Sequence, residues 1–328
     1  MNNDRSAAGP ENGIIVAGDA RVHSALDELA QAGRMVCFAG LPGTGKSLMI
    51  HQLAHLAHRR GRRISLLQWD TARPLFEASA AGRRYPHVDG VTHGIIRVAV
   101  GRWARHTVAD WHAQHPADDH LLIAETPFVG HRLIELARPA NDVAEAILNA
   151  DSCRFVVPVP SRAVRQHMEA ERERRMRAPQ HEREKEDAPS HVLRELWQQL
   201  AQVATELGLA PQMTGAGTQV PYDPDVYRDV YLKVLSRRHA QALPLDVILP
   251  ASGLSAYDFK IARADLLPHA ADIARCIREA ELAFPDGARH AAAHTSAGTT
   301  SPIGEYGRGL SRVPDGAALA YEIEHWYE

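Results

Sequence analysis

The chain has 328 residues, of which 45% are hydrophobic and 23% charged, and its formal net charge is −3. This length and composition allow one large domain or two modest ones with buried cores, and the balanced charge argues against a general nucleic-acid-binding surface. The longest apolar runs are shorter than the roughly 20 residues that cross a bilayer, and the polar N-terminus lacks the apolar stretch of a secretory signal. Three cysteines without CxxC or metal-ligand spacing are typical of a reducing compartment. We therefore expect a cytoplasmic protein that does not engage membranes.

Short apolar runs alternate with segments of helical periodicity along the chain. Continuous apolar runs are typical of strands buried on both faces of a sheet, and apolar residues at helical spacing, closed by glycines, predict helices. In chain order, the predicted strands cover 35–39, 64–69, 121–124, 155–159 and 245–249, and the predicted helices cover 22–32, 46–60, much of 74–116, 133–150 with a break at Pro139, and about 264–284. This alternation predicts an α/β fold of about five mainly parallel strands with helices on both faces.

Two segments depart from this pattern. Residues 161–187 are very highly charged with both signs mixed, and residues 286–316 are rich in Gly, Ala, Ser, Thr and Pro. We expect a flexible N-terminus over 1–20, one domain over 21–285 with a charged helical lid or insertion at about 161–242, and a flexible C-terminal tail over 286–328.

A glycine-rich loop follows the first predicted strand. The sequence GLPGTGKS at 40–47 matches G-x-x-x-x-G-K-[ST], with a strand before it and a helix after it. Such a loop turns backbone N–H groups toward an anion, and the helix N-terminus adds the positive end of its dipole. We expect Lys46 to reach the β- and γ-phosphates of a nucleoside triphosphate and the Ser47 hydroxyl to bind Mg²⁺. The predicted phosphate-binding residues are Gly40, Gly43, Thr44, Gly45, Lys46, Ser47 and Leu48.

On this motif and the order of elements around it, residues 35–260 resemble the P-loop NTPase superfamily, and within it the small-molecule kinases. The resemblance implies a three-layer kinase-like fold, ATP and Mg²⁺ as cofactors, and a small-molecule acceptor that is anionic or nucleoside-like. It also implies a substrate-handling residue after the second strand, an acid near Mg²⁺ after the third, and an arginine-bearing lid after the fourth.

Acidic residues stand at the expected strand ends. Asp70 follows the second predicted strand and precedes Arg73 by three residues. Asp70 is suited to accept a proton from an attacking hydroxyl and Arg73 to hold an anionic group, although an aspartate here also suits a helix cap. Glu125 directly follows four apolar residues of the third strand, and because an unpaired buried charge is costly, we expect it to bind Mg²⁺ or act on substrate.

Several arginines are candidates for contacts with phosphate or acceptor. After the fourth strand we expect Arg162 to contact the nucleotide and Arg165 to neutralise charge on the transferring phosphoryl group. Arg97 and Arg132 are candidates for the acceptor pocket. The alternative for the helical arginines is a solvated surface with ion pairs between neighbouring turns.

Three functions remain open at this point. The first is phosphoryl transfer from ATP·Mg to a small molecule, the second an ATPase with water as acceptor, and the third a nucleotide-sensing protein without an acceptor. NKxD, DxxG after the third strand, a paired Asp-Glu after the third strand and LSGGQ are absent from the sequence, which argues against GTPases, AAA-type ATPases and ABC-type proteins. The identity of the acceptor, the choice of nucleotide and homo-oligomer formation are not determined.

Overall fold

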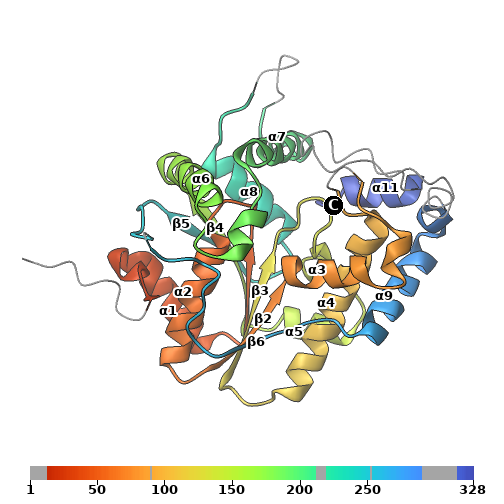
Figure 1. Cartoon of the computed structure of the whole chain (residues 1–328), viewed down its shortest axis with the longest axis horizontal. Helices are drawn as coiled ribbons and strands as arrows, with labels where there is room; N and C mark the ends of the chain where they lie inside the picture. The colour runs from red at the N-terminus through yellow and green to blue at the C-terminus, as the bar shows by residue number, and fades with distance from the viewer. Residues whose placement is uncertain (1–12, 89–90, 212–218, 252, 290–315) are drawn as a thin grey trace, which may run out of the picture.

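The computed structural model describes residues 13–88, 91–211, 219–251, 253–289 and 316–328. Within these residues one six-stranded, all-parallel sheet has the order β5-β4-β1-β3-β2-β6 (Figure 1). The strands are β1 Met35–Ala39, β2 Arg63–Gln68, β3 His120–Thr126, β4 Cys153–Pro160, β5 Ala240–Leu245 and β6 Arg263–Asp265. The predicted α/β class with a parallel sheet is confirmed, with six strands rather than about five.

Helices cover both faces of this sheet. The α-helices are α1 Ala20–Ala32, α2 Lys46–Arg59, α3 Trp69–Ala78, α4 Gly94–Gln114, α5 Val143–Leu148, α6 Arg162–Arg177, α7 Ser190–Glu206, α8 Pro224–Val234, α9 Ala270–Ala283 and α11 Ala317–Glu324. Short 3₁₀ helices are η2 Val16–Gly18, η3 Gly82–Arg84, η4 Ile134–Leu136 and η5 Glu182–Glu186. Figure 1 places α1 and α2 on one side of the sheet and α3, α4 and α9 on the other.

The side chains of β1 show how the two faces are filled. All five residues of this central strand are buried. Val36 and Phe38 pack among the apolar residues of α1 and α2, whereas Met35, Cys37 and Ala39 pack toward α4, α8 and α9. Successive side chains of a strand point to opposite faces, so a strand that is apolar throughout supplies both cores.

The last two strands differ from the prediction. The run 245–249 was expected as the fifth strand, but β5 ends at Leu245, and Val247 and Ile248 are about half exposed, at 46% and 50%. β5 alternates instead, with Leu243 and Leu245 buried at the edge of the sheet. β6 has only three residues, all exposed, so no apolar run indicates it.

Other boundaries shift for local reasons. The segment 74–116 divides into α3 and α4 with η3 between them, and 133–150 is helical only in η4 and α5. The expected helix at 264–284 begins at Ala270 because the residues before it form β6. No helix within the described ranges has the length and apolar character needed to cross a bilayer.

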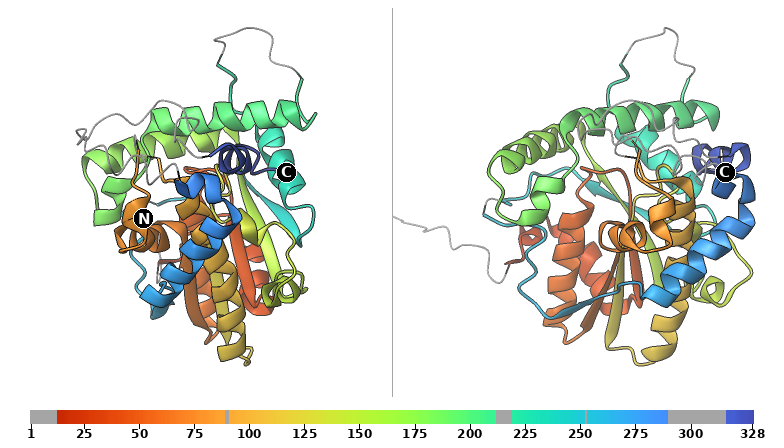
Figure 2. Two further views of the ribbon diagram at one scale, coloured as in Figure 1. Left: turned by 90° about the vertical axis from the view of Figure 1, so that its right-hand side faces the viewer. Right: turned by 45° about the vertical axis from the view of Figure 1, so that its right-hand side comes forward.

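The segment between β4 and β5 lies beyond one end of the sheet. Figure 2 shows α6 and α7, in green, across the top of the strands. Part of each predicted terminal segment, residues 1–12 and 290–315, lies outside the described residues. Within the described parts, Val16 is fully buried and Leu319, Ile323 and Trp326 of the C-terminal region join the main core.

Candidate functional site

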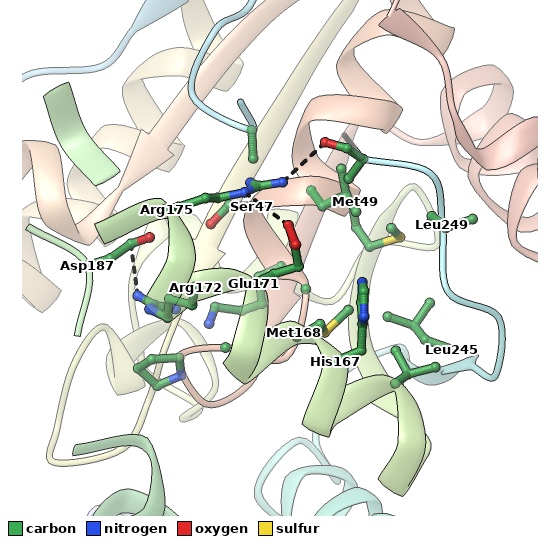
Figure 3. A pocket seen from close by; sticks show the side chains of 18 of the residues that line it. Ser47, Met49, His167, Met168, Glu171, Arg172, Arg175, Asp187, Leu245 and Leu249 are labelled. Atoms are coloured by element: carbon green, nitrogen blue, oxygen red, sulfur yellow. Dashed lines mark hydrogen bonds and ion pairs between the residues drawn. The ribbon is translucent and has the colours of Figure 1, made fainter. Parts of the chain in front are cut away.

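A cavity of about 230 Å³ lies at the carboxyl end of the central strands. It is bounded by the loop 40–47, the ends of β2 and β3, helix α6 and the segment after β5 (Figure 3). Ligands of parallel α/β sheets bind at this edge, because helix N-termini and loops converge there.

The glycine-rich loop joins β1 to α2 and forms one wall. Gly43 and Gly45 have φ values of +75° and +91°, a backbone conformation that residues other than glycine adopt only with strain. The Lys46 ammonium donates a 2.9 Å hydrogen bond back to the Leu41 carbonyl. Five of the predicted phosphate-binding residues line the cavity, namely Gly43, Gly45, Lys46, Ser47 and Leu48.

The other two predicted loop residues support the loop from behind. The Thr44 hydroxyl donates to the Leu41 carbonyl at 2.8 Å. Gly40 packs so closely on Tyr227 of α8 that an added Cβ would lie 2.2 Å from its hydroxyl oxygen. Helix α8 therefore fixes the shape of the loop, a role that the local motif does not indicate.

A buried ion pair lies beside the loop. Because β1 pairs directly with β3, Phe38 stands opposite Glu125 in the sheet. The Lys46 ammonium is 3.7 Å from Glu125 Oε1, and both residues are buried, with exposures of 4% and 8%. Gln68 also donates to Glu125 Oε2, at 3.4 Å.

Burial works against both charges of this pair. It lowers the pKa of Lys46 and raises the pKa of Glu125, and in each case the partner's charge opposes the shift. A bound anion beside Lys46 and a bound cation beside Glu125 would therefore stabilise these two buried charges further.

Two further charged residues, Asp70 and Arg132, line the same cavity without pairing with each other. Asp70 lies in the first turn of α3, where its charge suits the helix dipole, and it is exposed to the cavity. Its side chain makes no hydrogen bond or ion pair with any residue in the described ranges, and its carboxylate caps no helix there. Burial lowers the pKa of Arg132, and the charge of Asp70 opposes this effect.

A strained hairpin holds Arg132. Phe128 and Arg132 exchange backbone hydrogen bonds of 2.9 and 3.1 Å. Phe128, His131 and Leu133 all have φ near +60°, which is costly for such residues and is often found at functional sites. Arg97 supports this hairpin by donating to the Gly130 carbonyl at 2.9 Å.

Helix α6 and two neighbouring segments close the cavity. Arg172 donates to Asp187 at 2.8 Å, and Arg175 donates to the Ala251 carbonyl at 3.2 Å (Figure 3). The Tyr257 hydroxyl donates to Asp187 at 2.7 Å, and the Ser255 hydroxyl donates to Glu184 at 2.7 Å. Sequence reasoning missed four of these lining residues, Arg175, Glu184, Asp187 and Tyr257. The charged composition of 161–187 was the only signal for Arg175, Glu184 and Asp187, and no local pattern indicated Tyr257.

Four arginines selected from the sequence do not line the cavity. Arg73 pairs with Glu77 at 2.7 Å, and Arg97 is buried at the hairpin. Arg162 is exposed and pairs with Asp223 at 2.7 Å. Arg165 is buried, pairs with Glu169 at 3.0 Å and lies over the ring of Tyr222.

The orientation of α6 explains why Arg162 and Arg165 lie outside the cavity. Its cavity face carries Val164, Met168, Glu171 and Arg175, spaced at helical intervals. Arg165 turns toward α7 and Tyr222 instead. The arginines of α6 that line the cavity, Arg172 and Arg175, therefore lie about two turns or more beyond the expected Arg165.

The other end of the cavity is apolar. It is lined by Leu48, Met168, Leu245, Ile248 and Leu249, and Figure 3 shows Met168, Leu245 and Leu249 grouped there. The half-exposed residues Val247 and Ile248 thus line the cavity instead of the core.

Comparison of the chain with protein-family models, curated proteins and solved structures gave no match. Function therefore has to follow from the chemistry of the cavity itself.

Proposed function

We propose that this protein transfers the γ-phosphoryl group of ATP to a hydroxyl of a small-molecule acceptor, as a P-loop kinase. The observation that carries the proposal is the presence of Asp70 and Arg132 in the same cavity as Lys46 and Ser47. Water needs no such second set of recognition groups, whereas an organic acceptor does. Three free cysteines and the use of ATP support a cytoplasmic location.

The loop and α6 supply the donor side of this site. Backbone N–H groups of the loop and the ammonium of Lys46 bind the phosphates, and Arg172 and Arg175 lie where they can neutralise charge on the transferring group. The apolar end, with Leu48, Met168 and Leu245, suits the nucleotide base.

The residues beside the loop fit Mg²⁺. Ser47 offers a hydroxyl oxygen and Glu125 a carboxylate within one cavity, the hard oxygen donors that this ion prefers. Ser47 and Glu125 would hold the ion, and its charge would offset that of the phosphates.

Asp70 and Arg132 supply the acceptor side. Asp70 accepts the proton of the attacking hydroxyl as the new oxygen–phosphorus bond forms and the bond to the bridging oxygen breaks, releasing ADP. Arg132 holds an anionic group of the acceptor, since a half-buried guanidinium is well suited to bind carboxylate or phosphate.

Hydrolysis is the second candidate, because Glu125 lies beside Lys46 and is placed to orient a water molecule. Measuring ADP release from ATP·Mg with pooled metabolites distinguishes the two. Phosphoryl transfer predicts stimulation by one compound class, loss of turnover in Lys46→Ala, and a fall of about 10²-fold or more in Asp70→Asn.

Asp110→Asn is the matched control, because Asp110 is exposed on α4 and outside the cavity. Unstimulated hydrolysis that survives Asp70→Asn would instead support an ATPase. Tight ATP binding without turnover would support a nucleotide sensor.

A further inference from the structure

A second cluster of reactive side chains lies between α4 and α9, away from the cavity. These helices run side by side on one face of the sheet (Figure 1). His106 comes from α4, and Cys276 and Glu279 come from α9. One ligand atom of each lies within 4.8 Å of the others, and His106 Nδ1 is 3.7 Å from Cys276 Sγ.

Helix geometry brings the three groups together. Cys276 and Glu279 are three residues apart, so they share a face of α9. Cys276 is fully buried, while His106 and Glu279 are partly exposed at the rim. The cluster is therefore open to ions from solvent on one side and supported by the core on the other.

The separations match a metal site with little adjustment. Nitrogen and sulfur ligands of tetrahedral zinc, at about 2.0–2.3 Å from the ion, lie about 3.3–3.8 Å from each other. The His106–Cys276 separation already falls in this range. Glu279 needs only a side-chain movement, which its partly exposed position permits.

The surrounding charges are also compatible with a cation. The Glu279 carboxylate supplies negative charge beside Cys276, and a metal that binds there would displace the proton of the thiol. The nearby cation, Arg275, hydrogen-bonds Cys276 and donates to Asp272 at 2.8 Å. Its side chain is 45% exposed, so it can turn toward solvent when a metal binds.

We propose that His106, Cys276 and Glu279 bind one borderline-soft divalent metal ion of the zinc type, with water in the fourth position. Imidazole, thiolate and carboxylate are the three protein donors that such ions take, whereas the thiolate disfavours Mg²⁺. The ion would cross-link α9 to α4. Helix α9 follows the edge strand β6. This site is independent of the proposed phosphoryl transfer.

Cobalt(II) is a direct probe of this site. The full-length protein, freed of metals with a chelator, is titrated with CoCl₂ and followed by absorption. We expect one equivalent to bind with a thiolate-to-cobalt charge-transfer band and tetrahedral d–d bands, and Zn²⁺ to displace the cobalt and raise the Tm.

Variants assign the ligands. Cys276→Ser should remove the charge-transfer band, and His106→Ala and Glu279→Gln should each weaken cobalt binding by at least about tenfold. Cys153→Ala, at a buried cysteine of β4, should retain the band, as should Lys46→Ala in the phosphate loop.

Circular dichroism identifies any variant that fails to fold, and Glu279→Gln, at a partly exposed residue, keeps the test informative if Cys276→Ser does not fold. Absence of a charge-transfer band, or a band and affinity that none of the three ligand variants changes, would overturn the proposal.

Discussion

Lys46 and Glu125 meet because β1, which leads into the phosphate loop, and β3, which carries Glu125, are neighbours in the sheet. Each charge is buried, and each makes the other's charged form less costly. The two residues are therefore coupled in stability as well as in the binding of nucleotide.

This coupling predicts different outcomes for stability and binding. Lys46→Ala leaves the Glu125 carboxylate buried without its partner, and we expect a loss of about 3 kcal/mol in the free energy of unfolding. Adding Glu125→Gln should recover much of that loss, whereas ATP binding should stay at least about 100-fold weaker than in the wild type. Urea denaturation and calorimetric ATP titration measure the two effects. Equal stability of the single and double variants would contradict the coupling.

Sequence reasoning located best the residues that stand at or just after the ends of strands. Lys46, Ser47, Asp70 and Glu125 line one cavity because a motif or the end of an apolar strand fixes where each backbone lies. Arg97 and Arg165 could not be placed in the same way. Their positions depend on the rotation of a helix and on partners such as Gly130 and Tyr222 that are distant in sequence.

At the scale of elements, the loop depends on contacts from the segment between β4 and β5. A Cβ added at Gly43 would lie 2.9 Å from Leu193 of α7, and φ at Gly43 is +75°. Gly61, after α2, has a similar φ of +77° but open space around it.

These two glycines form a matched pair. Gly43→Ala and Gly61→Ala should each lower the free energy of unfolding by about 1–2 kcal/mol, because both place alanine in a left-handed conformation. Only Gly43→Ala should also weaken ATP binding, since it displaces the phosphate loop. Similar ATP dissociation constants for the two variants would argue against the loop as the phosphate site.

Helix α6 offers a second matched set. Arg172 and Arg175 line the cavity, whereas Arg174 is 68% exposed and pairs with Glu171. We expect Arg172→Ala and Arg175→Ala to reduce kcat for ADP release by about tenfold or more through lost charge neutralisation, and Arg174→Ala to leave it nearly unchanged. Steady-state kinetics on all three decides this, and wild-type rates in Arg172→Ala and Arg175→Ala would show that these arginines do not neutralise charge in the reaction.

The first four strands were predictable because each is a mainly apolar run between two covered faces. β5 and β6 were not, since an edge strand alternates or is short and exposed. Residues 247–249, the end of the predicted fifth strand 245–249, line the cavity instead. A surface that faces a ligand and a surface that faces the core share the same composition, and local sequence does not separate them.

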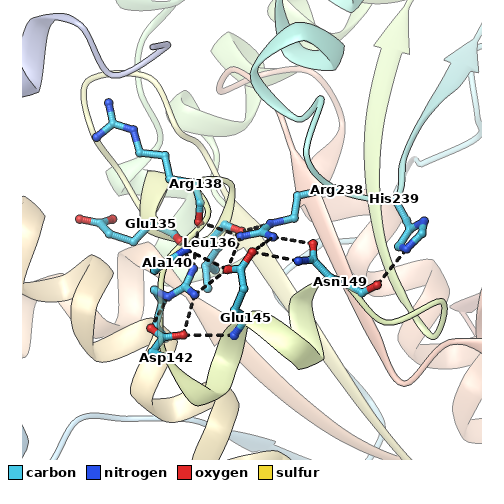
Figure 4. A network of polar contacts seen from close by, with 10 residues as sticks. Glu135, Leu136, Arg138, Ala140, Asp142, Glu145, Asn149, Arg238 and His239 are labelled. Atoms are coloured by element: carbon cyan, nitrogen blue, oxygen red, sulfur yellow. Dashed lines mark hydrogen bonds and ion pairs between the residues drawn. The ribbon is translucent and has the colours of Figure 1, made fainter.

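At the scale of the whole molecule, a polar network joins α4, α5 and a residue just before β5, which are far apart in the sequence. Glu145 of α5 accepts hydrogen bonds from Arg238, just before β5 (Figure 4). It also accepts one from Arg105 of α4. The Arg238 side chain is fully buried. Hydrogen bonds from Arg238 and Arg105 lower the pKa of Glu145 to about 2.

This network predicts how stability changes with acid. The pKa of Glu145 is lower in the folded chain than its usual 4.5, so its contribution is complete above pH 4.5 and is lost as the pH falls toward 2. At pH 7 Glu145→Gln should cost about 3 kcal/mol, and the difference from wild type should shrink between pH 4.5 and 2. Urea midpoints across this pH range provide the measurement.

Asp151→Asn is the control, because the Asp151 side chain is 91% exposed. It should follow the wild-type curve throughout. A constant difference between wild type and Glu145→Gln down to pH 2 would mean that Glu145 does not titrate as this network requires.

The destination of the γ-phosphate tests the proposed reaction most directly. The wild-type protein is incubated with [γ-³²P]ATP, Mg²⁺ and the pooled metabolites, and the labelled products are separated. Phosphoryl transfer predicts label in an organic product, absent with Lys46→Ala and strongly reduced with Asp70→Asn. Label recovered only as inorganic phosphate, at a rate that Asp70→Asn leaves unchanged, would contradict it.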